Sequence, residues 1–143
     1  MNFKSQIRFI GGHASPFALI VPHQLSMEIN ETRFITHESE SLQLGLIARP
    51  SGFKFPPHSH RKQLREVSET REVLVVKKGV CKLVIYNDDG HLLDQVMLYP
   101  GDVAMLIRGG HSLEAVEDLE LIEIKQGPYL GFDDKFSIEP ITR

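Results

Sequence analysis

The chain has 143 residues, of which 41% are hydrophobic, so it is long enough for one domain (residues 1–143) with a single sizeable core. Its 16 Lys and Arg against 19 Asp and Glu give a net charge of -3. Neither sign forms a long block, so nothing in the sequence indicates nucleic acid as a partner. The single cysteine, Cys81, cannot form an internal disulfide and lies in an apolar run, so we expect a buried thiol in a reducing compartment. With no apolar run of membrane-spanning length and no apolar stretch near the N-terminus, we expect a soluble, unprocessed, cytoplasmic protein.

Taken from the N-terminus, the chain alternates short apolar runs with turn residues, which is typical of an all-β sandwich or barrel, and helical periodicity is nearly absent. The first segment that stands out, Gly11–Pro16, is loop-like. Strands are expected over the following ranges: Thr32–His37, Leu42–Ala48, Phe53–His58, Arg71–Lys77, Val80–Tyr86, Leu92–Leu98, Val103–Ile107, Ser112–Val116 and Leu119–Lys125. The heavily charged residues 61–71 indicate a solvated loop, with a substrate-facing lid as the alternative.

Turn residues separate these strands. Asn87-Asp88-Asp89-Gly90 tolerates positive φ and predicts a hairpin over Val80–Leu98. Gly79 marks another tight corner, and Pro100-Gly101-Asp102 and Arg108-Gly109-Gly110 bracket the short strand between them. Beyond Gly127 the chain has the composition of an irregular tail.

Four residues indicate a metal site. His58 and His60 are two positions apart, so on a strand both imidazoles point to the same face. Pro56-Pro57 excludes a helix there. Glu72 opens a β-branched run and His111 follows a glycine turn, so separate β elements deliver the carboxylate and the third imidazole. Any one of these histidines taken alone is better explained as a half-buried structural residue, but the ordered set favours a common divalent ion such as Fe, Mn, Ni, Cu or Zn.

These residues resemble the cupin family. Its first motif is similar to Gly52 with His58-Ser59-His60, then Glu72, then Gly79, and the insertion between His60 and Glu72 is interpreted as a longer loop. The second motif is similar to Pro100-Gly101-Asp102 through Gly109-Gly110-His111. The resemblance covers about residues 42–126. It implies a double-stranded β-helix (cupin or jelly-roll) barrel with irregular N- and C-terminal extensions, in which His58, His60, Glu72 and His111 hold one divalent transition metal.

Other polar residues are candidates for shaping a pocket. Glu123 and Lys125 share one face of their strand, either towards solvent or into the cavity as an acid/base pair, and they are the weak catalytic candidates. Arg49 has the chemistry to bind an anionic group, although surface placement is the alternative. Tyr86 and Tyr129 are interpreted mainly as packing residues. The remaining histidines, His13, His23, His37 and His91, are expected on the surface or in loops.

The sequence therefore supports two functional hypotheses. The first is a metal-dependent small-molecule enzyme acting on a sugar or sugar derivative, by isomerase, epimerase, lyase or dioxygenase chemistry. The run Glu123-Ile124-Lys125-Gln126-Gly127-Pro128-Tyr129 resembles cupins linked to cell-surface polysaccharide synthesis, which directs the substrate prediction towards carbohydrate. The second is a non-catalytic module that binds or senses a small ligand. Because cupins commonly pair through edge strands, we expect a homodimer, with no membrane and no nucleic acid as partner.

Overall fold

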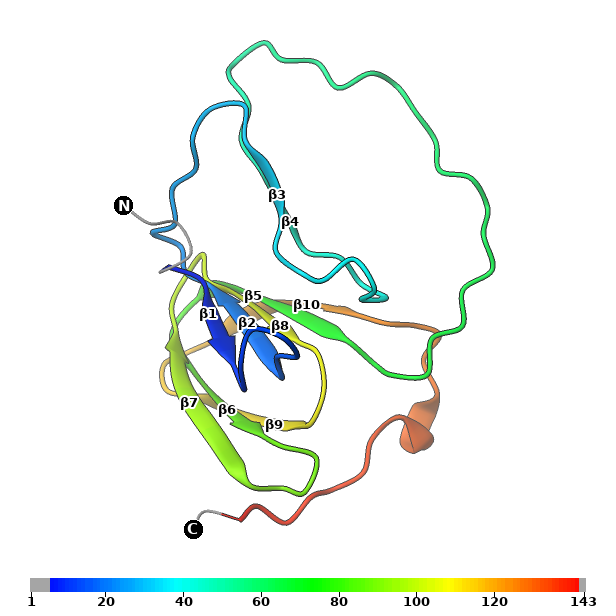
Figure 1. Cartoon of the computed structure of the whole chain (residues 1–143). Helices are drawn as coiled ribbons and strands as arrows, with labels where there is room; N and C mark the ends of the chain where they lie inside the picture. The colour runs from blue at the N-terminus through cyan, green and yellow to red at the C-terminus, as the bar shows by residue number, and fades with distance from the viewer. Residues whose placement is uncertain (1–5, 142–143) are drawn as a thin grey trace. The chain divides into compact units, whose positions relative to one another are not determined.

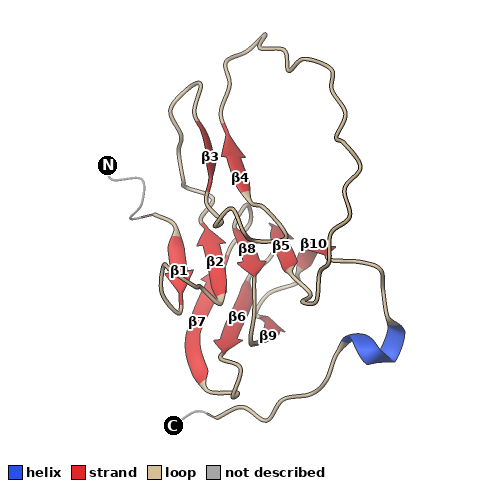
Figure 2. Cartoon of the chain, turned by 45° about the vertical axis from the view of Figure 1, so that its right-hand side comes forward, coloured by secondary structure: helices blue, strands red, loops and turns tan. Residues whose placement is uncertain are grey.

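The computed structural model describes residues 6–141, and within this range the protein is all-β with antiparallel sheets and no α-helix (Figures 1 and 2). One short 3-10 helix, η2 (Gly131–Asp134), follows the last strand. The described chain divides into two compact units, one made of residues 6–25 and 69–141 and the other of Ser26–Ser68. The prediction that residues 1–143 form one domain stays a prediction, and each unit is described by itself.

The larger unit contains two antiparallel sheets. The five-stranded sheet has the order β1 (Arg8–Ile10), β2 (Ala18–Val21), β8 (Val103–Leu106), β5 (Glu72–Lys78) and β10 (Glu120–Lys125). The three-stranded sheet has the order β7 (Leu92–Leu98), β6 (Cys81–Tyr86) and β9 (Gly110–Ala115). The smaller unit holds one pair of strands, β3 (Thr32–Phe34) and β4 (Gly45–Ile47).

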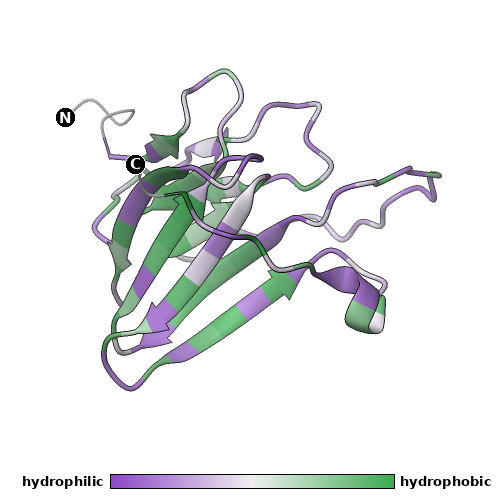
Figure 3. Ribbon diagram, turned by 90° about the horizontal axis from the view of Figure 1, so that it is seen from below, coloured by the Kyte–Doolittle hydropathy of each residue, from purple (hydrophilic) through white to green (hydrophobic). Residues whose placement is uncertain are grey.

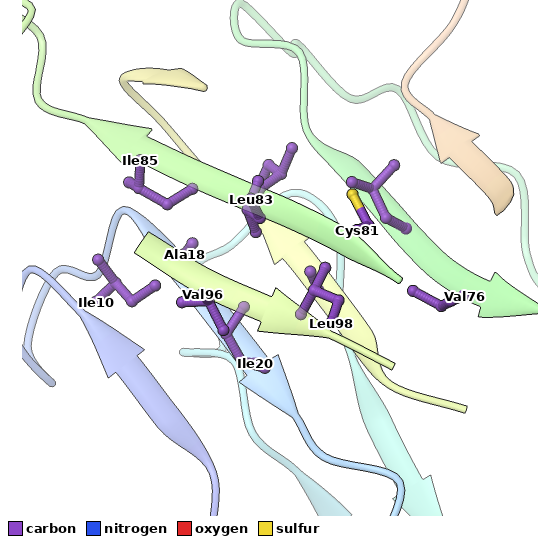
Figure 4. Close-up of a cluster of buried hydrophobic side chains, with 12 residues drawn as sticks. Ile10, Ala18, Ile20, Val76, Cys81, Leu83, Ile85, Val96 and Leu98 are labelled. Carbon is purple, nitrogen blue, oxygen red and sulfur yellow. The ribbon is translucent and has the colours of Figure 1, made fainter. Parts of the chain in front are cut away.

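A single core lies between the two sheets of the larger unit (Figure 4). Strands of both sheets contribute side chains to this core, since alternate residues along a strand point to the same side of its sheet. Along the strands hydrophobic and hydrophilic segments follow one another, as Figure 3 shows. The buried cluster comprises Ile10, Ala18, Ile20, Leu74, Val76, Ala104 and Leu106 from the five-stranded sheet and Cys81, Leu83, Ile85, Val96 and Leu98 from the three-stranded one. The fold is therefore a two-layer arrangement of open sheets, and the sheet order does not close into the predicted barrel.

The predicted hairpin between β6 and β7 is confirmed. Asn87 organises its turn: the side-chain Oδ1 accepts hydrogen bonds from the backbone N–H groups of Asp89 (3.0 Å) and His91 (2.8 Å). Gly90 has a φ of 85° and donates its N–H to the Asn87 carbonyl (3.0 Å), a conformation that favours glycine. The predicted corner at Gly79 is also confirmed, with a φ of 78°.

Two predictions about strands are wrong. Residues 8–21, expected to be an irregular extension, instead contribute β1 and β2 to the five-stranded sheet. The run Ala18–Val21 is buried on both faces, so it lacks the alternation by which half-buried strands are recognised. Conversely, Phe53–His58 forms no strand and is exposed throughout. Pro56 and Pro57 have no N–H to donate to a neighbouring strand, so this segment cannot sustain a ladder of hydrogen bonds.

Candidate functional site

Glu72 and His111 lie side by side at one end of the larger unit. Glu72 is the first residue of β5, and its side chain points to the core side of the sheet because it is in phase with Leu74. His111 lies opposite Ile85 in the other sheet and therefore faces the same interior. His111 Nε2 is 3.2 Å from Glu72 Oε2, and only 8% of the Glu72 side chain is exposed. The carboxylate and the imidazole thus meet across the two layers.

The charges around Glu72 favour its ionised form. The pKa of Glu72 is lowered from its usual value of 4.5, chiefly by the hydrogen bond from His111, while burial opposes this shift. The charges of His111, Lys125 and Lys135 lower the pKa further. Glu72 is therefore a carboxylate near neutral pH, which is the form that binds a metal ion.

Lys125 occupies the position next to Glu72 on the neighbouring strand β10. Its Nζ donates a hydrogen bond to Asp134 Oδ2 at 3.0 Å, and the Asp134 side chain is only 6% exposed. Nζ also lies 5.6 Å from the centre of the Tyr129 ring. The bond to Asp134 raises the pKa of Lys125, against the effect of burial, so the side chain keeps its charge. Glu123, the other predicted acid/base candidate, lies opposite Leu74 and is exposed.

His58 and His60 lie in the smaller unit, in an extended, exposed segment. Their ring centroids are 5.4 Å apart, so the two imidazoles stay close although the segment is not a strand. His58 Nδ1 is 2.9 Å from the carbonyl oxygen of Pro56. A carbonyl oxygen only accepts, so Nδ1 carries the proton and a neutral ring has its Nε2 lone pair free for a metal.

The structure thus places the four predicted ligands as two pairs, one in each unit. Over residues 6–141, no three side chains of His, Cys, Asp or Glu are gathered so that they could hold a metal ion. That all four bind one ion stays a prediction. Each pair consists of ligand types that divalent transition metals prefer, and in the Glu72–His111 pair the proton that His111 donates has to leave before the imidazole binds an ion.

Several other polar residues have structural roles. In the smaller unit, Arg49 donates to the backbone oxygens of Glu31 and Ala48, both at 2.7 Å, and stacks near Phe53. The Arg49 guanidinium is therefore bound to backbone oxygens of its own unit. It matches neither of the two predictions, which were that it binds an anionic group or that it only lies at the surface. Gln43 donates to the backbone oxygens at positions 37, 38 and 40 and stabilises that turn.

His23, expected to be an unremarkable loop residue, is tied to Asp102. Both its backbone N–H and its Nδ1 lie 2.7 Å from Asp102 Oδ1. The second oxygen of this buried carboxylate accepts the N–H of Tyr99 at 2.8 Å. Asp102, noted in the sequence as a turn residue, therefore joins β2 to the β7–β8 turn.

Sequence reasoning missed the contribution of the tail after β10. Asp134 and Lys135 come from a segment with an irregular composition, and no spacing rule connects Asp134 with Lys125. Only the alternative that Glu123 and Lys125 enter the cavity as an acid/base pair pointed to this region.

Among the described residues, the structure contains no helix that is both long and apolar enough to traverse a bilayer.

Comparison of the chain with protein-family models, with curated proteins and with solved structures gave no match.

Proposed function

We propose that this protein is a metal-dependent enzyme of the cupin type in which His58, His60, Glu72 and His111 bind one divalent transition metal. The observation that carries this proposal is the 3.2 Å contact between Glu72 and His111, which belong to different sheets and to different sequence motifs. A buried carboxylate and an imidazole are ligand types that a divalent ion binds once the proton that His111 donates to Glu72 has left.

The proposed fold is the double-stranded β-helix of that family. Three observations support this fold. Two antiparallel sheets share one core, the chain turns tightly at Gly79 and Gly109, and the Glu72 side chain points to the core side of its sheet. The substrate is a sugar or sugar derivative, following the resemblance of the segment after Glu123 to cupins of polysaccharide synthesis. Reactions of isomerase, epimerase, lyase or dioxygenase type are consistent with the ligand set.

When bound, such an ion polarises a carbonyl or hydroxyl oxygen or, if redox-active, binds dioxygen. Side chains of the protein supply the other functions, which are hydrogen-bond donation and proton transfer. Before an ion binds, the hydrogen bond from His111 keeps Glu72 ionised, and Lys125, fixed by Asp134, is a charged donor next to Glu72 for an oxygen of the substrate. Glu123, on the same face of β10 as Lys125 and exposed, is the second proposed acid/base residue.

Metal analysis of protein purified without an affinity tag or added metal tests the proposal. We expect about one ion per chain, and a loss of more than roughly 10-fold in metal affinity for each of His58→Ala and His111→Ala, since even the removal of a residue that only orients a ligand costs that much. His91→Ala is the matched control, because His91 is an exposed residue of the β6–β7 turn. Equal metal content in all four proteins would contradict the proposed site.

A second experiment separates an enzyme from a binding module. Metal-loaded wild type and His111→Ala are incubated with sugars, acid sugars and nucleotide sugars, and products are followed by mass spectrometry and NMR. Turnover by wild type alone supports the enzyme, whereas saturable binding without product supports a non-catalytic carbohydrate-binding protein.

A further inference from the structure

The segment after β10 exposes several large apolar side chains close together in the chain. Tyr129, Leu130 and Phe136 are 75%, 63% and 88% exposed, and Phe132 is completely exposed. Soluble proteins seldom leave so much apolar surface in one place, and such a patch commonly marks an interface with another molecule. Since these side chains contribute little to the core, the fold itself does not explain them. Residues 129–136 are called the apolar tail segment below.

The apolar tail segment is attached to the larger unit, and the chain after it runs on to the β6–β7 turn (Figure 1). Lys125 Nζ of β10 donates to Asp134 Oδ2 at 3.0 Å, and the Asp134 side chain is only 6% exposed. Further along, the N–H of Ile141 donates to the Gly90 carbonyl at 2.7 Å, and the Ile141 carbonyl accepts the N–H of Leu92 at 2.9 Å. The exposed rings therefore lie on an anchored piece of chain, which reduces the entropy that binding would cost.

Two opposite charges lie within the apolar tail segment. Asp133 and Lys135 are exposed, and within residues 6–141 neither makes a hydrogen bond or ion pair. Asp134, which lies between them, is already bound to Lys125. In an interface with two-fold symmetry, a contact between two different residues forms twice, once in each direction. Two copies of the chain can thus form two equivalent ion pairs, each between Asp133 of one copy and Lys135 of the other.

The exposed apolar area is that of a small dimer interface. Because an aromatic side chain buries about 150–250 Å², the rings of Tyr129, Phe132 and Phe136 offer roughly 500 Å² per copy. Two copies in contact would bury about 1,000 Å² in total, which is near the lower limit for a specific interface. A strongly acidic or basic partner would place a like charge against either Asp133 or Lys135, whereas a second copy satisfies both.

We infer that this protein forms a two-fold symmetric dimer through the apolar tail segment. Phe132 and Phe136 of the two copies pack together, and Asp133 of each copy pairs with Lys135 of the other. This contact differs from the pairing of edge strands expected from the sequence, because it uses side chains of the tail and no backbone of β9 or β10. It does not rest on the proposed metal site and is tested without metal.

Sedimentation velocity of the full chain over a range of protein concentrations measures the dimerisation. The variants are Phe132→Ser, Phe136→Ser, Asp133→Lys, Lys135→Asp and the double variant in which both charges are reversed. Tyr99→Ser is the matched control, because Tyr99 is an aromatic residue of the larger unit that is also exposed (46%) but lies in the turn between β7 and β8. Far-UV circular dichroism verifies that each variant is folded.

We expect each phenylalanine variant to weaken the dimer more than about tenfold, because each substitution removes a ring from both halves of the interface. Each single charge variant should weaken it about fivefold or more, because like charges then face each other, and the double variant should return to within about twofold of wild type. Tyr99→Ser should change the dimerisation less than about twofold.

A wild-type protein that stays monomeric at every concentration would refute the inference. A dimer that tolerates both phenylalanine variants forms at another surface, such as the edge strand β10, and would refute it as well. If the double variant does not recover, the pairing of Asp133 with Lys135 is wrong. A monomer that sediments with phosphatidylcholine vesicles, and loses this binding in Phe132→Ser, would show that lipid covers the patch and not a second copy. The proposed function stands in each of these cases, because metal binding is measured separately.

Discussion

Replacement of Asp102 by alanine should destabilise the larger unit strongly. The buried carboxylate accepts hydrogen bonds from the backbone N–H groups of His23 (2.7 Å) and Tyr99 (2.8 Å), and His23 Nδ1 is a third partner at 2.7 Å. Hydrogen bonds to a charged group contribute about 1.5–3 kcal/mol each, and the lower value applies because the donor residues His23 and Tyr99 are exposed although the carboxylate is buried. Two backbone bonds and about 1 kcal/mol for the imidazole give a loss of about 4 kcal/mol. This is a large part of the 5–15 kcal/mol typical of a domain.

Urea unfolding followed by far-UV circular dichroism measures this loss, since the chain contains no tryptophan. Asp102→Asn retains one acceptor oxygen and should lose about half as much, and His23→Ala should lose only about 1 kcal/mol because its backbone N–H still donates. Asp118→Ala, at an exposed position, is the control and should change stability by less than about 0.5 kcal/mol. The reasoning is refuted if Asp102→Ala lies within about 1 kcal/mol of wild type, or if His23→Ala costs as much as Asp102→Ala.

Three further predictions concern single positions. Gly79→Ala should cost more than about 2 kcal/mol in unfolding free energy, because its φ is 78° and a Cβ would lie 2.0 Å from the Asp118 carbonyl oxygen. Gly131→Ala is the control: its φ is 70° but a Cβ there would meet no atom within 4 Å, so it should cost only about 1 kcal/mol. Equal costs for the two variants would contradict the close approach at Gly79. Burial raises the pKa of the Cys81 thiol, so iodoacetamide should modify it only on unfolding, and rapid labelling of the native protein at pH 8 would show that the core is open. The folded-state pKa of Glu72 is below 4.5, so its ionisation stabilises the metal-free protein above that pH, and this stabilisation is lost as the pH falls further. Glu72→Gln should therefore make the free energy of unfolding depend less on pH in the acid range. An unchanged dependence on pH in this range would disprove the effect.

Where a structural feature depends on local chemistry, the sequence was enough to predict it. Asn87 and Gly90 specify the β6–β7 hairpin, because an amide acceptor and a residue that adopts positive φ suffice to form that turn. The alternation along β10 correctly placed Glu123 and Lys125 on one face. The strand at Ala18–Val21 was missed because it is buried on both sides and has no period of two.

Half of the candidate site could be anticipated and half could not. The order of motifs brought Glu72 and His111 into one hypothesis, and the structure places them 3.2 Å apart. Nothing in the sequence pairs Lys125 with Asp134, because that bond depends on the path of an irregular tail. The loop at His58 and His60 was assigned to a strand because two residues in alternate positions were given more weight than the prolines before them.

By itself the sequence determined the all-β class, the turns and the chemical types of the candidate ligands, since these follow from side-chain volume, backbone freedom and alternation over a few residues. The tertiary structure decided which residues distant in the chain are neighbours: the end strands of each sheet, the carboxylate beside His111 and the partner of Lys125. Such contacts depend on the register of the strands and on the packing of the two sheets. Register and packing are determined by the burial of the whole core, because no short stretch of the chain contains that information.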